Sequence, residues 1–291
     1  MTAEPNSDFL LVVDGDEARR QLLDAREALR AGRLAPYLGP GLLGLSAEPP
    51  AVPATPEAVA EALHKRSPAP SKIRTNMWSV AQHIEQRRHR RTLQAWMSEI
   101  FAAEPRPTAL HHFLAGLRLP MIVDSWYDGA MRAALIEAGR TDVSHIQGIT
   151  RAGEFRDVWT RLYDLQGHEL AAVGAEDTLL YEPHGGARPS GNFLVADSDY
   201  VEVLTEIDIQ TPIPEEVRAR RQALGFLFLG CRFDDQMLRT YARQIIKRSK
   251  GPHFAVIPAA ALTKNERRFL ATQGIVALDL PLAEAQALLV S

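Results

Sequence analysis

Two glycine-containing turns follow short apolar segments and are the first candidates for ligand chemistry. Gly39 and Gly41 follow one such segment, and Gly230 and Arg232 follow another. Glycine lets a backbone approach a phosphate closely, the N–H groups of the turn can bind its oxygens, and a guanidinium can bind a phosphate or a ribose hydroxyl. A turn of this kind is the usual cradle for a phosphate. A Gly-x-Gly turn alone is also typical of a plain strand-to-loop connection.

Polar and aromatic residues stand at two further positions where chemistry could take place. Asp124, Ser125 and Trp126 follow an apolar segment, and His184 precedes Gly185. A histidine can accept a proton from a hydroxyl group, whereas an indole donates only one hydrogen bond. A carboxylate at position 124 could stabilise a cation or repel a phosphate. The ordinary interpretation of His184 is a loop histidine with a local hydrogen bond.

Four short motifs give the chain a recognisable order. They are Gly-Pro-Gly at 39–41, Asp-Ser-Trp-Tyr-Asp at 124–128, His-Gly-Gly at 184–186 followed by Asp-Tyr at 199–200, and Gly-Cys-Arg-Phe-Asp-Asp at 230–235. The series resembles the bacterial sirtuin-like proteins, distant relatives of the sirtuin deacylases. Their pattern is Gly-Ala-Gly, Thr-Thr-Asn-Tyr-Asp, His-Gly, Asp-Tyr and Gly-Tyr-Ser-x-x-Asp. The resemblance covers residues 34–280.

The resemblance implies a Rossmann-like fold that binds NAD or an ADP-ribose-like nucleotide. Members of the family cleave the bond between nicotinamide and ribose, either to deacylate lysine or to destroy NAD. On this chain, the resemblance assigns the catalytic positions to His184, Asp124 and Trp126. It assigns cofactor binding to Gly39, Gly41, Ser125, Gly185, Gly230 and Arg232.

Several positions depart from the family pattern. Pro40 replaces the central alanine of the glycine turn and has no N–H to offer a phosphate. Leu43 replaces a hydroxyl residue, and Trp126 replaces the catalytic asparagine, so no amide is present there. Asp124-Ser125 stands where two threonines are usual, and Cys231-Arg232 stands where Tyr-Ser is usual.

These departures predict a divergent sirtuin-like protein with impaired catalysis, acting as a nucleotide-binding or protein-interaction module in a bacterial complex. The alternative is an NAD-cleaving hydrolase that uses His184, with another group in place of the asparagine. A zinc-ribbon deacetylase is not expected, because the ribbon needs paired cysteines and Cys231 is the single cysteine. No zinc or other metal is therefore expected.

The elements that must position these residues follow from the hydrophobic pattern. Strands are expected at 34–38, 119–123, 225–229, 253–257 and 275–278. Helices are expected at 16–31, at 56–65 with Thr55 as the N-cap, at 76–103 with an interruption near 87–91, and at 107–117, 214–224, 236–247 and 264–272. This alternation predicts the α/β class, a Rossmann-like doubly wound parallel sheet with helices on both faces. We expect one domain over residues 1–291, with a helical insert at 50–118.

Charge and composition limit the partners. The formal net charge is -3, so no overall field attracts nucleic acid or an anionic membrane. No apolar stretch reaches the length of a membrane span and no signal peptide is recognisable, so we expect a cytoplasmic protein whose partner is another protein or a second copy. The basic run 87–91 is expected to be a solvated helix face; the alternatives are a nucleic-acid patch or a docking site for an acidic protein.

Overall fold

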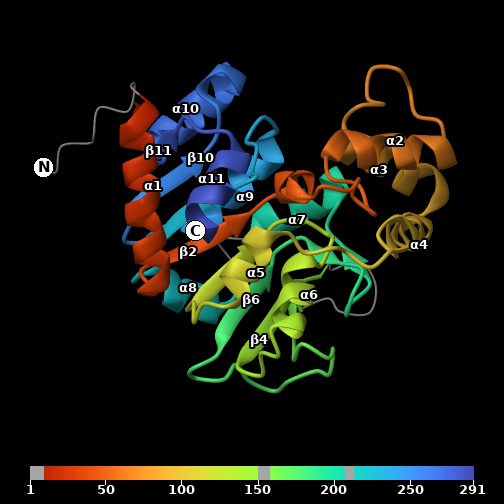
Figure 1. Ribbon diagram of the computed structural model, residues 1–291. Helices are drawn as coiled ribbons and strands as arrows, with labels where there is room; N and C mark the ends of the chain where they lie inside the picture. Colours follow the sequence, from red (N-terminus) through yellow and green to blue (C-terminus); the bar gives the residue numbers. More distant parts are fainter. Residues whose placement is uncertain (1–9, 150–157, 207–212) are drawn as a thin grey trace, which may run out of the picture.

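The centre of the molecule is a parallel sheet between two layers of helices (Figure 1). The computed structural model describes residues 10–149, 158–206 and 213–291, and nine strands of this part form the sheet in the order β1-β11-β10-β9-β2-β3-β6-β4-β5. The strands are β1 (Val12–Val13), β2 (Leu34–Leu38), β3 (Met121–Asp124), β4 (Val143–Gly148), β5 (Thr160–Tyr163), β6 (Thr178–Glu182), β9 (Gly225–Leu229), β10 (His253–Val256) and β11 (Ile275–Leu278). A separate small pair consists of β7 (Gly185–Gly186) and β8 (Asn192–Phe193).

The sheet is doubly wound about β2. The chain passes from β2 to β3 and β4 on one side, then returns to β9 on the other side and continues to β10 and β11. Neighbouring strands pair in parallel, except for the antiparallel pair β4–β5 at one edge. The predicted Rossmann-like α/β class is therefore confirmed. Its winding reverses between β2 and β9, and open α/β sheets bind ligands beyond the carboxyl ends of the strands at such a point.

Helices cover both faces of the sheet. One face carries α1 (Gly15–Arg30), α5 (Ala109–Ala115), α6 (Ala130–Glu137) and α11 (Leu282–Val290); the other carries α8 (Glu215–Arg221), α9 (Gln236–Ile246) and α10 (Lys264–Thr272). Within β2, Leu34 and Leu38 pack in the first core, whereas Ala35 and Tyr37 pack in the second. Burial on both faces explains why this strand is apolar at almost every position.

Three helices of the predicted insert pack on one another beside the sheet, at the right of Figure 1: α2 (Pro56–Arg66), α3 (Met77–Arg88) and α4 (Arg90–Ile100). The first of them begins as the sequence predicts, because the Thr55 hydroxyl accepts a hydrogen bond from the Ala58 N–H at 3.1 Å and Pro56 occupies the first turn. The remaining helix of residues 50–118, α5, packs instead on α6 and α11 in the sheet layers.

The basic run 87–91 contains the joint between α3 and α4. His89 has a φ of 70°, which ends α3 and starts α4. Arg90 is only 15% exposed and forms ion pairs with Glu85 at 2.9 Å and with Asp199 at 2.6 Å. The expected solvated face is thus wrong for one residue, because Arg90 fastens the insert to α7 (Asp197–Glu206).

Two strands of the sheet carry weak sequence signals. The strand β1 has two residues that pair with β11 at the edge of the sheet. All six residues of β4 are buried, although Ser144, His145 and Gln147 interrupt its apolar pattern. No helix within the described ranges is both long and apolar enough to cross a membrane.

Candidate functional site

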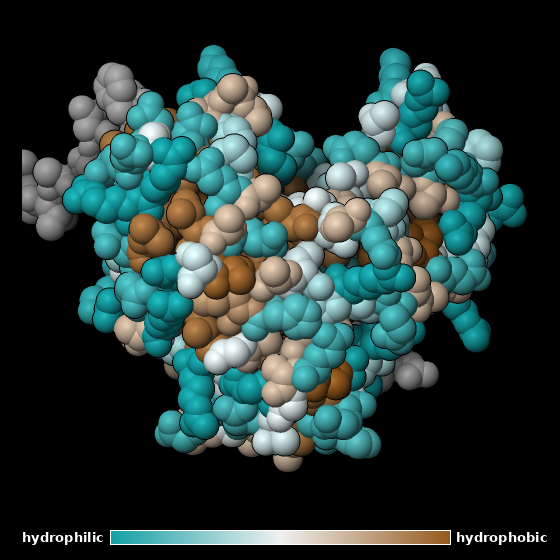
Figure 2. Space-filling model, viewed as in Figure 1, coloured by the Kyte–Doolittle hydropathy of each residue, from teal (hydrophilic) through white to brown (hydrophobic). Residues whose placement is uncertain are grey.

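A cavity of about 230 Å³ lies at the carboxyl ends of β2 and β9, where the winding of the sheet reverses. We name it the switch-point cavity. It is lined by Tyr37, Pro40, Gly41, Ala54, Thr55, Pro56, Glu57, Ser125, Trp126, Gly230, Cys231, Arg232, Phe233, Asp234 and Leu238. Its lining thus combines both glycine turns with the segment that leads into α2, and Figure 2 shows the surface hollowed between the insert and the rest of the molecule. The volume lies below the roughly 300–1,000 Å³ of pockets that hold drug-sized ligands.

The first glycine turn packs directly on the second. The Gly39 N–H donates to the Leu229 carbonyl at 2.9 Å, and the Gly41 N–H donates to the Gly230 carbonyl at 3.0 Å. A Cβ at Gly39 or Gly41 would lie 2.6 or 2.8 Å from the Gly230 oxygen. Both glycines are therefore required by the contact between the two turns, and both N–H groups are used within the protein.

Arg232, on the rim of the same cavity, is held by a buried acid. Its Nε and Nη2 lie 2.8 Å from the two carboxylate oxygens of Glu266, which is fully buried at the start of α10. Burial alone would raise the pKa of Glu266, but hydrogen bonds from Arg232 and from the N–H groups of Thr263 and Phe233 lower it to about 2. The guanidinium is thus paired within the protein.

Ser125 and Trp126 form another wall of the switch-point cavity. The Ser125 hydroxyl donates to the Leu38 carbonyl at 2.6 Å. The Trp126 indole is 2% exposed, and its Nε1–H donates to the Pro53 carbonyl at 2.8 Å. It also packs edge-on against Phe101, with the ring centroids 6.0 Å apart. The indole therefore ties the segment before α2 to the end of β3.

Asp124 is buried behind this wall. Its Oδ1 accepts the Trp126 N–H at 3.2 Å, whereas its Oδ2 has no partner in the described ranges. Burial raises the pKa of Asp124, and the nearby carboxylates of Asp128 and Glu182 raise it further. Asp124 is not among the residues that line the switch-point cavity.

His184 lies in a cage of tyrosine rings. Its ring centroid is 4.6 Å from that of Tyr241 and 5.6 Å from that of Tyr200, whose hydroxyl is 3.1 Å from the His184 Nδ1. The side chain is 2% exposed, and burial lowers its pKa to about 3, so the ring is neutral at pH 7. The Nε2 atom is buried without a hydrogen-bond partner among the residues that the structure describes.

The structure therefore divides the site residues expected from the sequence into two groups. Gly41, Ser125, Trp126, Gly230 and Arg232 line the switch-point cavity, next to Gly39. Asp124, His184 and Gly185 are buried outside its lining. The last of these has a φ of 73°, and a Cβ there would lie 2.2 Å from the Asn192 carbonyl oxygen, so glycine is needed for the β7–β8 pairing.

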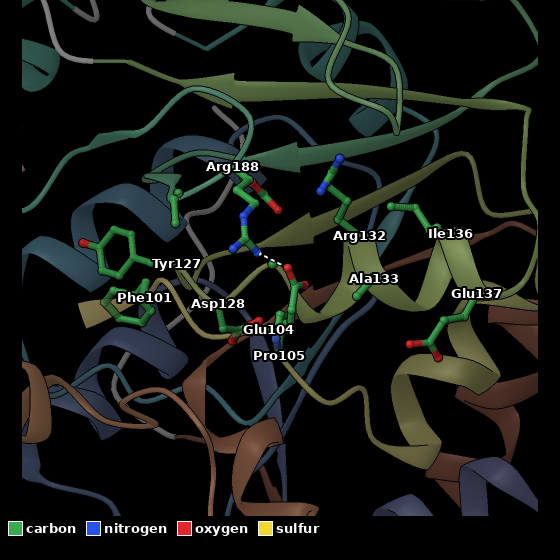
Figure 3. Close-up of a pocket in the computed structure, with 14 residues that line it drawn as sticks. Phe101, Glu104, Pro105, Tyr127, Asp128, Arg132, Ala133, Ile136, Glu137 and Arg188 are labelled. Carbon is green, nitrogen blue, oxygen red and sulfur yellow. Dashed lines mark hydrogen bonds and ion pairs between the residues drawn. The ribbon is translucent and has the colours of Figure 1, made fainter. Parts of the chain in front are cut away.

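A second cavity, of about 210 Å³, lies beyond β3 and β6 (Figure 3). We name it the acid-lined cavity. It is lined by Phe101, Glu104, Pro105, Tyr127, Asp128, Gly129, Arg132, Ala133, Ile136, Glu137, Glu182, Gly186, Ala187 and Arg188. In Figure 3 the ion pair between Arg188 and Glu104, 2.7 Å long, lies between the aromatic rings on one side and the α6 side chains on the other. The motifs of the sequence do not by themselves indicate this site.

Two acids of this second cavity, Asp128 and Glu182, are deeply buried. Asp128 is 8% exposed, and its Oδ1 accepts the Ala130 N–H at 2.5 Å at the start of α6. Burial raises the pKa of Asp128 to about 7, and the Glu182 carboxylate contributes to the rise. A usable signal existed in the sequence, since Glu182 ends an apolar strand segment and Asp128 closes the Asp-Ser-Trp-Tyr-Asp motif.

A bound dinucleotide would need free N–H donors for its pyrophosphate at the first glycine turn. The turn does not fit this group, because the N–H groups of Gly39 and Gly41 are used and Pro40 has none. The donor set for a zinc ribbon is equally missing, since the chain has one cysteine. Within the described ranges, no cluster of three or more His, Cys, Asp or Glu residues could hold a metal ion.

Comparison with known families places this geometry in context. The family model for the SIR2-like domain matches residues 120–278, which run from the start of β3 to the end of β11. SIR2-like domains generally bind NAD-related nucleotides. No curated protein matches the chain. The match spans more than half of the sequence and includes the Asp-Ser-Trp-Tyr-Asp, His-Gly and Gly230 motifs, so the chain belongs to the SIR2-like family.

Proposed function

We propose that this SIR2-like protein does not cleave NAD and acts as a binding component of a protein complex. One observation carries the proposal: the two N–H groups of the first glycine turn donate to the carbonyls of Leu229 and Gly230. The turn therefore packs on its neighbour where a phosphate cradle would need outward-facing donors. A dinucleotide could displace these contacts only by separating two turns whose backbones touch.

Three further contacts support the loss of turnover. Arg232 is paired with the buried Glu266, the Trp126 indole is bonded to Pro53, and His184 lies outside the lining of the switch-point cavity. To act on a nucleotide, Arg232 would have to break its ion pair, Trp126 would have to break its hydrogen bond, and His184 would have to leave its buried position. A SIR2-like fold without this activity would instead bind a partner protein or a second copy of the chain.

NAD cleavage with His184 as the base is the second candidate. It is favoured by the His184 Nε2 atom, which is buried without a partner within the described part of the chain. The ring is neutral at pH 7, but a pKa of about 3 makes it a weak proton acceptor, which counts against this candidate. A ribose hydroxyl near this atom would satisfy it.

Nicotinamide release from NAD separates the two candidates. The purified full chain should release no nicotinamide above a blank without protein, and neither NAD nor ADP-ribose should raise its melting temperature. Release that disappears in His184→Ala would sink the proposal and establish the second candidate. An Arg91→Ala variant, which changes an exposed residue of the insert, controls for the mutagenesis.

Light scattering on a size-exclusion column tests the assembly part of the proposal. A mass above that of the 32.2 kDa chain would identify the partner as a second copy. A monomer directs the search to a different protein. A monomer that also cleaves NAD would contradict the first part of the proposal, the absence of NAD cleavage.

A further inference from the structure

The acid-lined cavity is separate from the site at the switch point. The two cavities share no lining residue, and the second lies beyond β3 and β6 rather than between β2 and β9. Its walls come from the segment after α4, one side of α6 along its length, the end of β6 and the segment around Arg188. Its ligand is therefore set by its own chemistry, independently of any nucleotide.

The charges around this cavity favour a cation. Four carboxylates line it, those of Glu104, Asp128, Glu137 and Glu182, against the two guanidiniums of Arg132 and Arg188. The Arg188 group is neutralised by Glu104 at 2.7 Å. The Arg132 Nη2 donates to the Leu165 carbonyl, and in Figure 3 this guanidinium points away from Asp128. Above about pH 7, where Asp128 is ionised, the remaining balance is negative on the side of the buried acids.

Glu182 offers a hydrogen-bond acceptor that the protein does not use. Its side chain is 1% exposed, and its Oε2 accepts from the Gln147 amide and lies 3.0 Å from the His145 Nε2. Its Oε1 has no partner among residues 10–149, 158–206 and 213–291. Leaving a buried carboxylate oxygen without a donor is costly, so a ligand that donates to it would be stabilised.

The rest of the wall suits an apolar stem and a positive head. Phe101 and Tyr127 present aromatic rings on one side in Figure 3, and Ala133 and Ile136 present aliphatic groups on the other. Aromatic rings attract cations through their quadrupole, and the attraction grows when water is displaced. An aliphatic surface contributes through burial of apolar area.

We propose that the acid-lined cavity binds a small organic cation, an ammonium or guanidinium group on a short apolar stem. Glu182 and Asp128 accept the hydrogen bonds of the charged head, and Phe101 and Tyr127 flank it. The stem lies along the aliphatic side chains of α6. This site goes beyond the proposed function and stands whether or not the protein cleaves NAD.

Isothermal titration calorimetry at pH 8 tests the site with four matched probes: n-butylammonium, butylguanidinium, butyrate and butanol. We expect saturable binding of at least one cation and no saturation with the anion or the alcohol. Glu182→Gln should weaken cation binding at least about tenfold, whereas the exposed control Glu61→Gln should not change it. Near-UV circular dichroism establishes that each variant is folded.

A second variant keeps the test valid if Glu182→Gln does not fold. Ala133→Phe adds a ring on the α6 side of the cavity, leaves every charge in place, and should abolish cation binding. The proposal is overturned if neither cation shows saturable binding with a dissociation constant below ~10 mM, because a pocket built for a small molecule binds far more tightly than that. Equal binding of butyrate, or unchanged cation binding in the folded variants, would overturn it as well.

Discussion

Burial shifts the protonation of two side chains in opposite directions. It raises the pKa of Asp128 to about 7 and lowers that of His184 to about 3. Between about pH 4 and pH 7, folded Asp128 holds a proton that the unfolded chain releases, so this residue makes stability fall as pH rises. Between about pH 3 and pH 6.5, His184 has the opposite effect, because the unfolded chain takes up the proton.

We expect Asp128→Asn to stabilise the protein at pH 8 and to have little effect at pH 4. The amide carries no charge to desolvate, and its oxygen can still accept the Ala130 N–H. The free energy of unfolding should rise at pH 8 by up to about 4 kcal/mol, the limit set by a shift of roughly three pKa units. Urea denaturation at both pH values measures the difference. Asp16→Asn, at an exposed position of α1, is the matched control. An equal rise in the free energy of unfolding of Asp128→Asn at pH 4 would contradict the explanation.

At this scale the sequence indicated which positions need a particular residue type, but it did not indicate which atoms those residues contact. The glycines at 39, 41, 185 and 230 are needed, but protein atoms make the closest approach at each of them: backbone at the first three and the Leu42 side chain at Gly230. Nothing in the local sequence around Arg232 indicates that Glu266, more than thirty residues later, is its partner. Such pairings depend on how strands and helices meet in space, which a single sequence does not encode locally.

At the scale of elements, one arginine connects the insert to the sheet domain. Arg90 begins α4, forms ion pairs with Glu85 and Asp199, and donates to the Phe193 carbonyl at 2.7 Å. Asp199 also accepts the N–H groups of Val195 and Ala196, so the carboxylate organises the start of α7. The insert and the His184 region are thus joined through a buried charge.

Arg90→Ala should lower the free energy of unfolding by about 3–5 kcal/mol, because it leaves the buried Asp199 carboxylate without its cation. The neighbouring Arg91→Ala, which removes an exposed side chain, should change it by less than about 0.5 kcal/mol. Chemical denaturation of both variants measures the contrast. Equal effects of the two substitutions would show that Arg90 does not fasten the insert.

Element positions followed largely from the hydrophobic pattern. The bounds expected for β2, β9, α10 and β11 are those observed. The three strands are continuous apolar segments, and α10 has a capping signal, Thr263 with Glu266. The strand β4 lacks such a signal, because Ser144, His145 and Gln147 interrupt its apolar pattern. These polar side chains can be buried because residues outside β4 supply their partners. The break between α3 and α4 was expected from the basic run, but the burial of Arg90 was not.

At the scale of the whole molecule, the insert and one face of the sheet share a single apolar core. Val59 of α2, Ile84 of α3 and Met97 of α4 belong to the same buried cluster as Tyr181 and Phe228 of the sheet. The insert cannot separate from the sheet without exposing this cluster. The cost of that exposure should couple the two parts during unfolding.

The full chain should therefore unfold in one cooperative transition. Far-UV circular dichroism reports the helices, including those of the insert, and near-UV signals report tertiary packing of the aromatic residues. The two transitions in urea should coincide. Two separate steps in either signal would show that the insert unfolds on its own.

The position of Cys231 gives the molecule a built-in chemical probe. It is the single cysteine of the chain, it is 8% exposed, and it lines the switch-point cavity. Burial raises the pKa of its thiol, so alkylation in the closed state should be slow. The rate of Cys231 labelling under native conditions then measures how often the two glycine turns separate. A compound that holds the turns together will lower this rate.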